Sequence, residues 1–147
     1  MGLVNLQSPS LPVLADASFF VALFNDREHG HTRCKAAYNA FAGPLFTAEA
    51  CITEALHLLD HAEPAVEAIL TNVQQGALAV PFRLGDCATD VAYLMSKYAD
   101  TPCDFADACL IHLADQLGTG DILTLDSDFK HYRWRRNKHF RMLIPLK

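Results

Sequence analysis

The organisation of this chain can be read outward from residues 11–25, LPVLADASFFVALFN. The first five residues form a short apolar run that ends at Asp16, and aromatic and aliphatic residues then recur at spacings that suit a helix. This pattern predicts a buried strand, a turn at Asp16 and a helix over 17–25. A strand that leads directly into a helix is typical of the βα units from which parallel sheets are built.

The rest of the chain repeats this alternation of short apolar runs and amphipathic segments. Stop signals such as Gly43-Pro44, Gly76 and Gly118 separate the segments, and Thr47 is placed to cap the helix that follows it. We expect strands at 45–47, 77–82, 121–125 and 141–146, and helices at 31–42, 47–60, 64–75, 86–98 and 104–117. No Asn-Gly or similar hairpin signal joins two strands. The sequence therefore predicts an α/β fold in which helices cover both faces of a mainly parallel sheet of about five short strands.

Length and composition indicate one domain. With 147 residues, 51% of them hydrophobic, the chain can close one sizeable core, so we expect a single domain over 1–147 with a loose N-terminal extension at 1–10. Charges and prolines interrupt every apolar run before it reaches the roughly 20 residues of a membrane helix. The start shows no secretion or lipidation signal, and five cysteines without a C-x-x-C pair fit reduced, buried thiols. We therefore expect a cytoplasmic protein.

Acidic residues fall at positions where an α/β fold gathers ligands. Asp16 and Asp126 each end a predicted strand, and the carboxyl ends of parallel strands share one edge of a sheet. Asp104 and Asp107 lie one turn apart at the start of a predicted helix, while Glu54 lies on another helix among apolar neighbours. Taken singly, each aspartate has an ordinary alternative role as a helix cap or a turn residue. Taken together, these residues supply the hard oxygen ligands that suit Mg²⁺ or Mn²⁺.

Short motifs built around these acids follow one another along nearly the whole chain: VLADAS at 13–18, VAL at 21–23, TEA at 53–55, FADA at 105–108 and LTLDSDF at 123–129. Their order and spacing together resemble the PIN domain, and in particular the VapC-like toxin ribonucleases of toxin–antitoxin pairs. The resemblance implies a three-layer α/β/α fold. It also implies an acidic quartet that binds metal and catalyses cleavage, carried over here as Asp16, Glu54, Asp107 and Asp126.

The same resemblance implies a reaction and partners. The protein would be an endoribonuclease that uses Mg²⁺ or Mn²⁺ to hydrolyse RNA phosphodiester bonds, leaving 5′-phosphate and 3′-hydroxyl ends. It would be the toxin of a pair whose antitoxin blocks the acidic pocket, and it would form a homodimer. Two details stay open. Asp104 or Asp128 could join or replace a member of the quartet, and Ala17 stands where many family members have a hydroxyl residue, which removes one possible hydrogen bond near the site.

A basic and aromatic segment follows Asp126. Half of the twelve Lys and Arg residues lie between 130 and 141, in a chain whose formal net charge is −5. Interleaved cations and aromatic rings are typical of surfaces that bind RNA phosphates and bases. We therefore predict RNA contacts by Lys130, Arg133, Arg135 and Arg136. The equal alternative is that Trp134 and Phe140 pack into the core while the arginines form a solvated face.

Two other functions fit the same sequence. In the first, the fold is a non-catalytic RNA-binding or protein-interaction module, and the acidic residues serve mainly as caps. In the second, a metal-dependent phosphatase acts on small phosphate esters. Phosphatases with an aspartyl nucleophile need a second aspartate two residues later, where this chain has Ser18, and the sequence contains no glycine-rich phosphate loop. An Asp16→Asn protein that binds RNA without cleaving it would separate the ribonuclease from the binding module.

Overall fold

The computed structural model describes residues 11–41, 43–60, 62–98 and 100–146, and the predicted extension at 1–10 lies outside the described residues. Its helices are α1 (Ala17–Phe24), α2 (His31–Ala40), α3 (Glu49–Leu58), α4 (Glu63–Gln74), α5 (Ala88–Lys97) and α6 (Phe105–Leu117), with 3-10 turns η2 (Leu84–Asp86) and η3 (Ser127–Lys130). The strands are β1 (Val13–Ala15), β2 (Leu45–Phe46), β3 (Leu78–Ala79), β4 (Asp121–Leu123), β5 (Arg133–Trp134), β6 (Lys138–His139) and β7 (Arg141–Met142). Within the described residues, no helix has both the length and the apolar character needed to cross a membrane.

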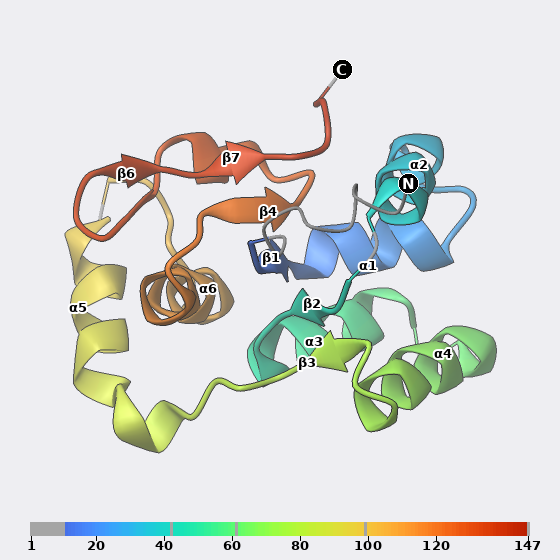
Figure 1. The fold of residues 1–147 in the computed structure, drawn as a ribbon, viewed down its shortest axis with the longest axis horizontal. Coiled ribbons are helices and arrows are strands. Elements are labelled where there is room, and N and C mark those ends of the chain that lie inside the picture. Colours follow the sequence, from blue (N-terminus) through green and yellow to red (C-terminus); the bar gives the residue numbers. More distant parts are fainter. Residues whose placement is uncertain (1–10, 42, 61, 99, 147) are drawn as a thin grey trace, which may run out of the picture.

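Five of these strands form one parallel sheet in the order β3-β2-β1-β4-β7 (Figure 1). The central strand is β1, whose Leu14 pairs with Phe46 of β2 on one side and with Ile122 of β4 on the other. Because β1 and β4 run in the same direction, the residues that follow them emerge side by side at one edge of the sheet. The predicted parallel sheet is confirmed, and Asp16 comes to lie beside the segment that follows β4.

The sheet separates two hydrophobic cores. Successive strand residues point to opposite faces of a sheet. Leu14 accordingly packs in the core formed with α5 and α6, whereas Val13 and Ala15 pack in the core formed with α1 and α4. Figure 1 shows the same division, with α5 and α6 on one side of the sheet and α1, α2 and α4 on the other. All five cysteines are free and buried, as predicted. The expected α/β/α layering is confirmed.

Thr47 does not cap the helix that follows it, so that prediction is wrong. α3 begins at Glu49 after the N-cap residue Ala48, which makes no side-chain cap hydrogen bond. The Thr47 side chain is fully buried, and its hydroxyl donates to the main-chain oxygen of Ala15 at 2.8 Å. The parallel pairing of β2 with β1 brings this hydroxyl beside a carbonyl, and a buried polar group takes such a partner. The bond ties β2 to the residue that precedes Asp16.

An unpredicted hairpin, β5–β6, packs against the C-terminal half of α6. Trp134 pairs with Lys138, and the turn between them holds Arg135 and Arg136 at φ values of 43° and 74°. Hairpin turns with positive φ normally use Gly, Asn or Asp, so the usual sequence signal is missing here. The Arg135 main-chain N–H donates to Asp115 of α6. This tertiary contact holds a turn that the local sequence does not favour.

Candidate active site

Asp16 lies at the carboxyl end of β1, where α1 begins. Its Oδ1 accepts a hydrogen bond from the main-chain N–H of Phe19 at 3.1 Å, so Asp16 caps the helix. Its Oδ2 accepts a hydrogen bond at 2.6 Å from the hydroxyl of Thr124, the residue that follows β4. Only 5% of Asp16 is exposed. The cap and the proposed site role are therefore compatible, because one carboxylate serves the helix while it lies at the edge of the sheet.

Two hydroxyl groups fix Asp16 relative to Asp126. Ser18 Oγ donates to Asp16 Oδ1 at 2.7 Å and accepts from the N–H of Leu125 at 2.9 Å. Thr124 Oγ1 donates to Asp16 Oδ2 and accepts from the N–H of Asp126 at 2.9 Å. A hydroxyl can bridge in this way because it both donates and accepts. Neither hydroxyl was predicted from the sequence to take part in the site, although each lies two positions from a strand-end aspartate.

Although position 17 is an alanine, each oxygen of the Asp16 carboxylate has a hydroxyl partner. Ala17 is buried, and the two donors are Ser18 and Thr124. The hydrogen bond that a hydroxyl residue at position 17 could add is therefore not needed to hold the Asp16 side chain in place.

Asp126 lies at the neighbouring strand end and starts η3. Its Oδ1 accepts a hydrogen bond from the main-chain N–H of Asp128 at 2.9 Å, so it caps this 3-10 turn. The side chains of Asp126 and Asp128 are both partly exposed. Asp126 therefore resembles Asp16 in combining a local capping role with a place at the edge of the sheet. Asp128 contributes only its main-chain N–H to this cap.

Asp104 and Asp107 share the start of α6 but differ in their contacts. Asp104 is exposed and is the N-cap, because its Oδ1 accepts from the Asp107 N–H at 2.9 Å. Asp107 is half-buried, and its Oδ2 accepts from the Tyr132 hydroxyl at 2.9 Å. Burial raises the pKa of Tyr132 above its usual range, so the phenol keeps the proton that it donates. Asp107 is the member of this pair that faces the protein interior.

The carboxylates of the predicted quartet, Asp16, Glu54, Asp107 and Asp126, are called the acidic group below. Glu54 lies at its outer edge. It is an exposed residue of α3, and partial burial followed by the charges of Asp104 and Asp126 raises its pKa above the usual value. The structure thus brings the four predicted carboxylates into one region. Asp16, Asp107 and Asp126 form its inner part, since Asp16 is buried and Asp107 and Asp126 are partly buried, whereas Glu54 is exposed.

Burial and mutual repulsion make these carboxylates hard to ionise. Burial is the largest cause at Asp16 and raises its pKa from 3.8 to about 6, with a smaller contribution from the charge of Asp126. Burial, followed by the charge of Asp104, raises the pKa of Asp107 to about 8. Burial also raises the pKa of Asp126. Among the described residues, no Lys or Arg forms an ion pair with any of the quartet, so their charge lacks a protein counter-ion there.

This donor set fits a hard divalent cation. Carboxylate oxygens are the ligands that Mg²⁺ and Mn²⁺ prefer, and a cation relieves the repulsion within an acidic group. In the part of the chain that the structure describes, no three acidic, histidine or cysteine side chains form a complete metal-binding group as they stand. The residues that could hold the ion are Asp16, Asp107 and Asp126, with Glu54 at the edge.

The structure divides the predicted RNA-binding residues between two places. Lys130 is exposed at the end of η3, the turn that Asp126 begins, and the Arg133 guanidinium donates to the main-chain oxygen of Lys130 at 2.9 Å. Arg135 packs at Gly118, the C-cap of α6, whereas Asp107 lies in the first turn of that helix. At about 1.5 Å per residue, the two helix positions are about 16 Å apart along the axis.

The aromatic residues of the basic segment are structural. Trp134 and Phe140 are both buried, which confirms that part of the alternative prediction. Arg135 and Arg136 are exposed in the hairpin turn, and the Arg135 guanidinium lies 5.7 Å from the Trp134 ring centroid. The segment thus combines core packing by its rings with an exposed basic turn.

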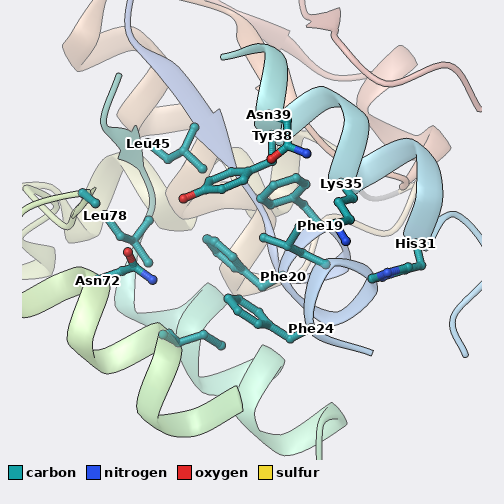
Figure 2. A pocket seen from close by; sticks show the side chains of 13 residues that line it. Phe19, Phe20, Phe24, His31, Lys35, Tyr38, Asn39, Leu45, Asn72 and Leu78 are labelled. Atoms are coloured by element: carbon teal, nitrogen blue, oxygen red, sulfur yellow. The ribbon is translucent and has the colours of Figure 1, made fainter. Parts of the chain in front are cut away.

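A separate cavity of about 320 Å³ lies among α1, α2 and α4 and the adjacent strand starts. Figure 2 shows its aromatic lining, which includes Phe19, Phe20, Phe24 and Tyr38, with Lys35 among the polar side chains around it. The cavity contains no member of the acidic quartet. It is linked to the acidic group through α1, because Phe19 lines the cavity while its main-chain N–H bonds to Asp16.

Comparisons with known proteins agree with this fold. The family model of the PIN domain matches residues 13–135. Among solved structures, the chain is similar to VapC20 of Mycobacterium tuberculosis, described as a sarcin–ricin loop cleaving toxin, with 18% sequence identity and a TM-score of 0.73. That similarity covers 81% of this chain and 93% of VapC20. The comparison with curated proteins gave no match. The predicted fold is thereby confirmed.

Proposed function

This chain belongs to the PIN-domain family, and from that premise we propose that it is a metal-dependent endoribonuclease. The proposal is supported above all by one arrangement: buried Asp16 is tied through Thr124 to Asp126, and the charges of both aspartates act on Asp107. Together with Glu54, these carboxylates would hold Mg²⁺ or Mn²⁺ and form the catalytic group.

The residues that would surround a bound metal ion determine what chemistry the ion would supply. An RNA phosphodiester is an anion, so bare carboxylates would repel it. A divalent cation held between them would lower the pKa of an attacking water and stabilise the charge that develops on the phosphoryl oxygens. Asp16 is pre-organised for this role because Ser18 and Thr124 hold both of its oxygens. Attack by water with departure of the 3′-oxygen would leave 5′-phosphate and 3′-hydroxyl ends.

The substrate would lie across the acidic group and the start of the basic segment. Lys130 follows Asp126 closely, so we assign it the phosphate contact nearest the cut. Arg133 and Arg136 line one hollow beside Asp115, so we assign them, with Arg135, contacts with RNA farther away. VapC20 is described as cleaving the sarcin–ricin loop, so a ribosomal RNA loop belongs among the substrates to be tested. Such a target would place the activity in the cytoplasm.

A toxin of this kind would be held inactive by an antitoxin protein, and it would act as a homodimer. The observation that favours a protein partner is the aromatic cavity beside α1 (Figure 2). Phe20 and Phe24 line it, and apolar side chains of a partner would remove this surface from water. A partner seated there would also contact the helix that Asp16 caps.

The decisive experiment is cleavage of a pool of structured RNAs, including a sarcin–ricin loop, with Mg²⁺, Mn²⁺ or EDTA. Wild type is compared with Asp16→Asn and Asp107→Asn, and with Asp86→Asn as a control, because Asp86 is exposed and pairs with Arg83 outside the acidic group. We expect metal-dependent cuts with 5′-phosphate ends in wild type and Asp86→Asn only. Folded wild type that binds RNA and never cuts would favour the binding module, and turnover of a phosphomonoester without RNA cleavage would favour the phosphatase.

A further inference from the structure

Tyr132 is held rigidly inside the core next to the acidic group. Its side chain is fully buried, and its ring makes edge-to-face contacts with Tyr98 at 5.0 Å and with Phe129 at 5.1 Å between centroids. Phe129 in turn packs edge-to-face on Phe140 at 5.2 Å. Aromatic rings packed in this way have a fixed position and orientation. The Tyr132 hydroxyl is therefore a fixed point in the structure.

That hydroxyl contacts α6 on both sides of its N-terminus. It donates to Asp107 Oδ2 at 2.9 Å, and it also contacts the main-chain oxygen of Pro102, which precedes the helix. A phenol has one proton, so it can serve only one of the two acceptors fully at a time. An ionised carboxylate is the stronger acceptor, because hydrogen bonds to charged groups are stronger than those to neutral ones. The contact with Asp107 is thus favoured when that carboxylate is charged.

We propose that Tyr132 is a positioning residue for Asp107, which it holds by one carboxylate oxygen so that the other is presented to the divalent cation. The inference rests on the proposed function, because it assigns Asp107 to the cation. Without the phenol, the Asp107 side chain would rotate more freely and would have to be ordered when the ion binds. Partners that orient metal ligands typically change metal affinity by about 10- to 100-fold when they are removed.

Tyr98 provides a matched control. Its hydroxyl also makes hydrogen bonds inside the protein, accepting from the Arg133 main-chain N–H at 2.9 Å, but its partner is the backbone of the hairpin. Its ring packs on the ring of Tyr132. Removing either hydroxyl therefore perturbs the same aromatic cluster, and only the Tyr132→Phe change touches an acidic side chain.

The test measures metal binding as well as activity. Mn²⁺ binding to the full chain is followed by the electron paramagnetic resonance signal of free Mn²⁺ for wild type, Tyr132→Phe and Tyr98→Phe. We expect Tyr132→Phe to bind Mn²⁺ at least about 10-fold more weakly and to need correspondingly more Mn²⁺ for half-maximal RNA cleavage, with kcat largely restored at saturating metal. Tyr98→Phe should bind Mn²⁺ like wild type. Unchanged Mn²⁺ affinity in Tyr132→Phe overturns the proposal, whatever happens to its thermal stability.

A second measurement uses the wild-type protein and does not depend on the Phe variant folding. The chain has four tyrosines, so the Tyr132 ring resonance in a ¹³C-tyrosine-labelled sample can be assigned by exclusion with Phe variants of the other three. Addition of Mg²⁺ should shift the Tyr132 resonance and leave that of Tyr98 nearly unmoved. A Tyr132 resonance that stays in place at saturating Mg²⁺ would refute the positioning role. Wild type that neither binds Mn²⁺ nor cuts RNA would instead refute the proposed function and this inference with it.

Discussion

The hydroxyl of Thr124 donates to Asp16 Oδ2 at 2.6 Å, although 108 residues separate the two in the chain. The same hydroxyl oxygen accepts the main-chain N–H of Asp126 at 2.9 Å. One fully buried side chain therefore determines how two strand-end aspartates are oriented toward each other. Because the bridge needs both a donor and an acceptor in one small group, few other side chains can replace threonine there.

We expect Thr124→Val to lower both stability and activity. Valine keeps the shape, but Asp16 loses a donor and the Asp126 N–H loses its acceptor, which should cost about 1–3 kcal/mol of the free energy of unfolding. RNA cleavage should fall by at least about 10-fold because Asp16 is less firmly held. Urea unfolding and cleavage rates measure these effects. Thr71→Val, an exposed position on α4, is the control, and wild-type cleavage by a folded Thr124→Val protein would contradict the assigned role.

The stability of the metal-free protein should fall as pH rises from about 4 to about 8. The folded-state pKa of Asp107 is about 8 against an ordinary value of 3.8, so in this interval the folded protein keeps a proton that the unfolded chain has lost. The folded state then binds more protons, and the free energy of unfolding decreases with pH. Asp16, with a pKa of about 6, acts in the same direction at the lower end.

Thermal unfolding in EDTA at pH 5.5 and pH 8 tests this dependence by comparing wild type with Asp107→Asn. The variant should lose less stability between the two pH values than wild type does, because it lacks the titrating group. Asp86→Asn, which changes an exposed carboxylate paired with Arg83, should keep the wild-type difference. An equal pH dependence in wild type and Asp107→Asn would show that Asp107 does not titrate in this range.

Divalent cations should stabilise the protein more at pH 8 than at pH 5.5. A cation needs ionised carboxylates, so its binding competes with the protons that Asp16 and Asp107 retain at lower pH. At a Mn²⁺ concentration of 100 times Kd, the expected stabilisation is about 2.7 kcal/mol. Calorimetric titration with Mn²⁺ at both pH values measures the affinity and the proton release. A Mn²⁺ affinity that does not change with pH, or that survives Asp16→Asn unchanged, would argue against this site.

Gly120→Ala should destabilise the fold by about 1–3 kcal/mol or more, because overpacking a filled core forces its neighbours to move. A Cβ at position 120 would lie 2.0 Å from Trp134 Nε1, and this indole N–H already donates to the His139 carbonyl. Trp134 is the only tryptophan, so its fluorescence during thermal unfolding reports directly on the packing around position 120. Gly85→Ala is the control, since its Cβ would meet nothing within 4 Å. Equal stabilities would mean that the indole can move away.

The fold was largely predictable because its signals are local. The apolar run before Asp16, the helical spacing after it and glycine stops such as Gly118 each reflect interactions within a few residues. The hairpin was not predictable in this way. Its turn places Arg135 and Arg136 at positive φ, and what holds it, an Asp115 contact and packing against α6, comes from a helix about 20 residues earlier in the chain.

The candidate site could be proposed from the sequence in composition and less so in detail. Acidic residues at strand ends and helix starts were expected from their positions, and the family resemblance selected Asp16, Glu54, Asp107 and Asp126 from among them. Their partners were not expected. Ser18, Thr124 and Tyr132 are ordinary residues in the sequence, and Thr47 looked like a helix cap, because a hydroxyl reveals its partner only once distant strands are side by side.

The sequence by itself determined the order of the helices and of the five strands of the parallel sheet, the α/β architecture and the candidate acidic residues, because hydrophobic periodicity and stop residues act over short distances. Only the tertiary structure decided which acids are buried, which hydroxyls hold them and how far their pKa values rise. Those properties depend on desolvation and on charges brought together from segments such as β1, β4 and α6. No local pattern in the chain encodes them, because they exist only when these segments pack together.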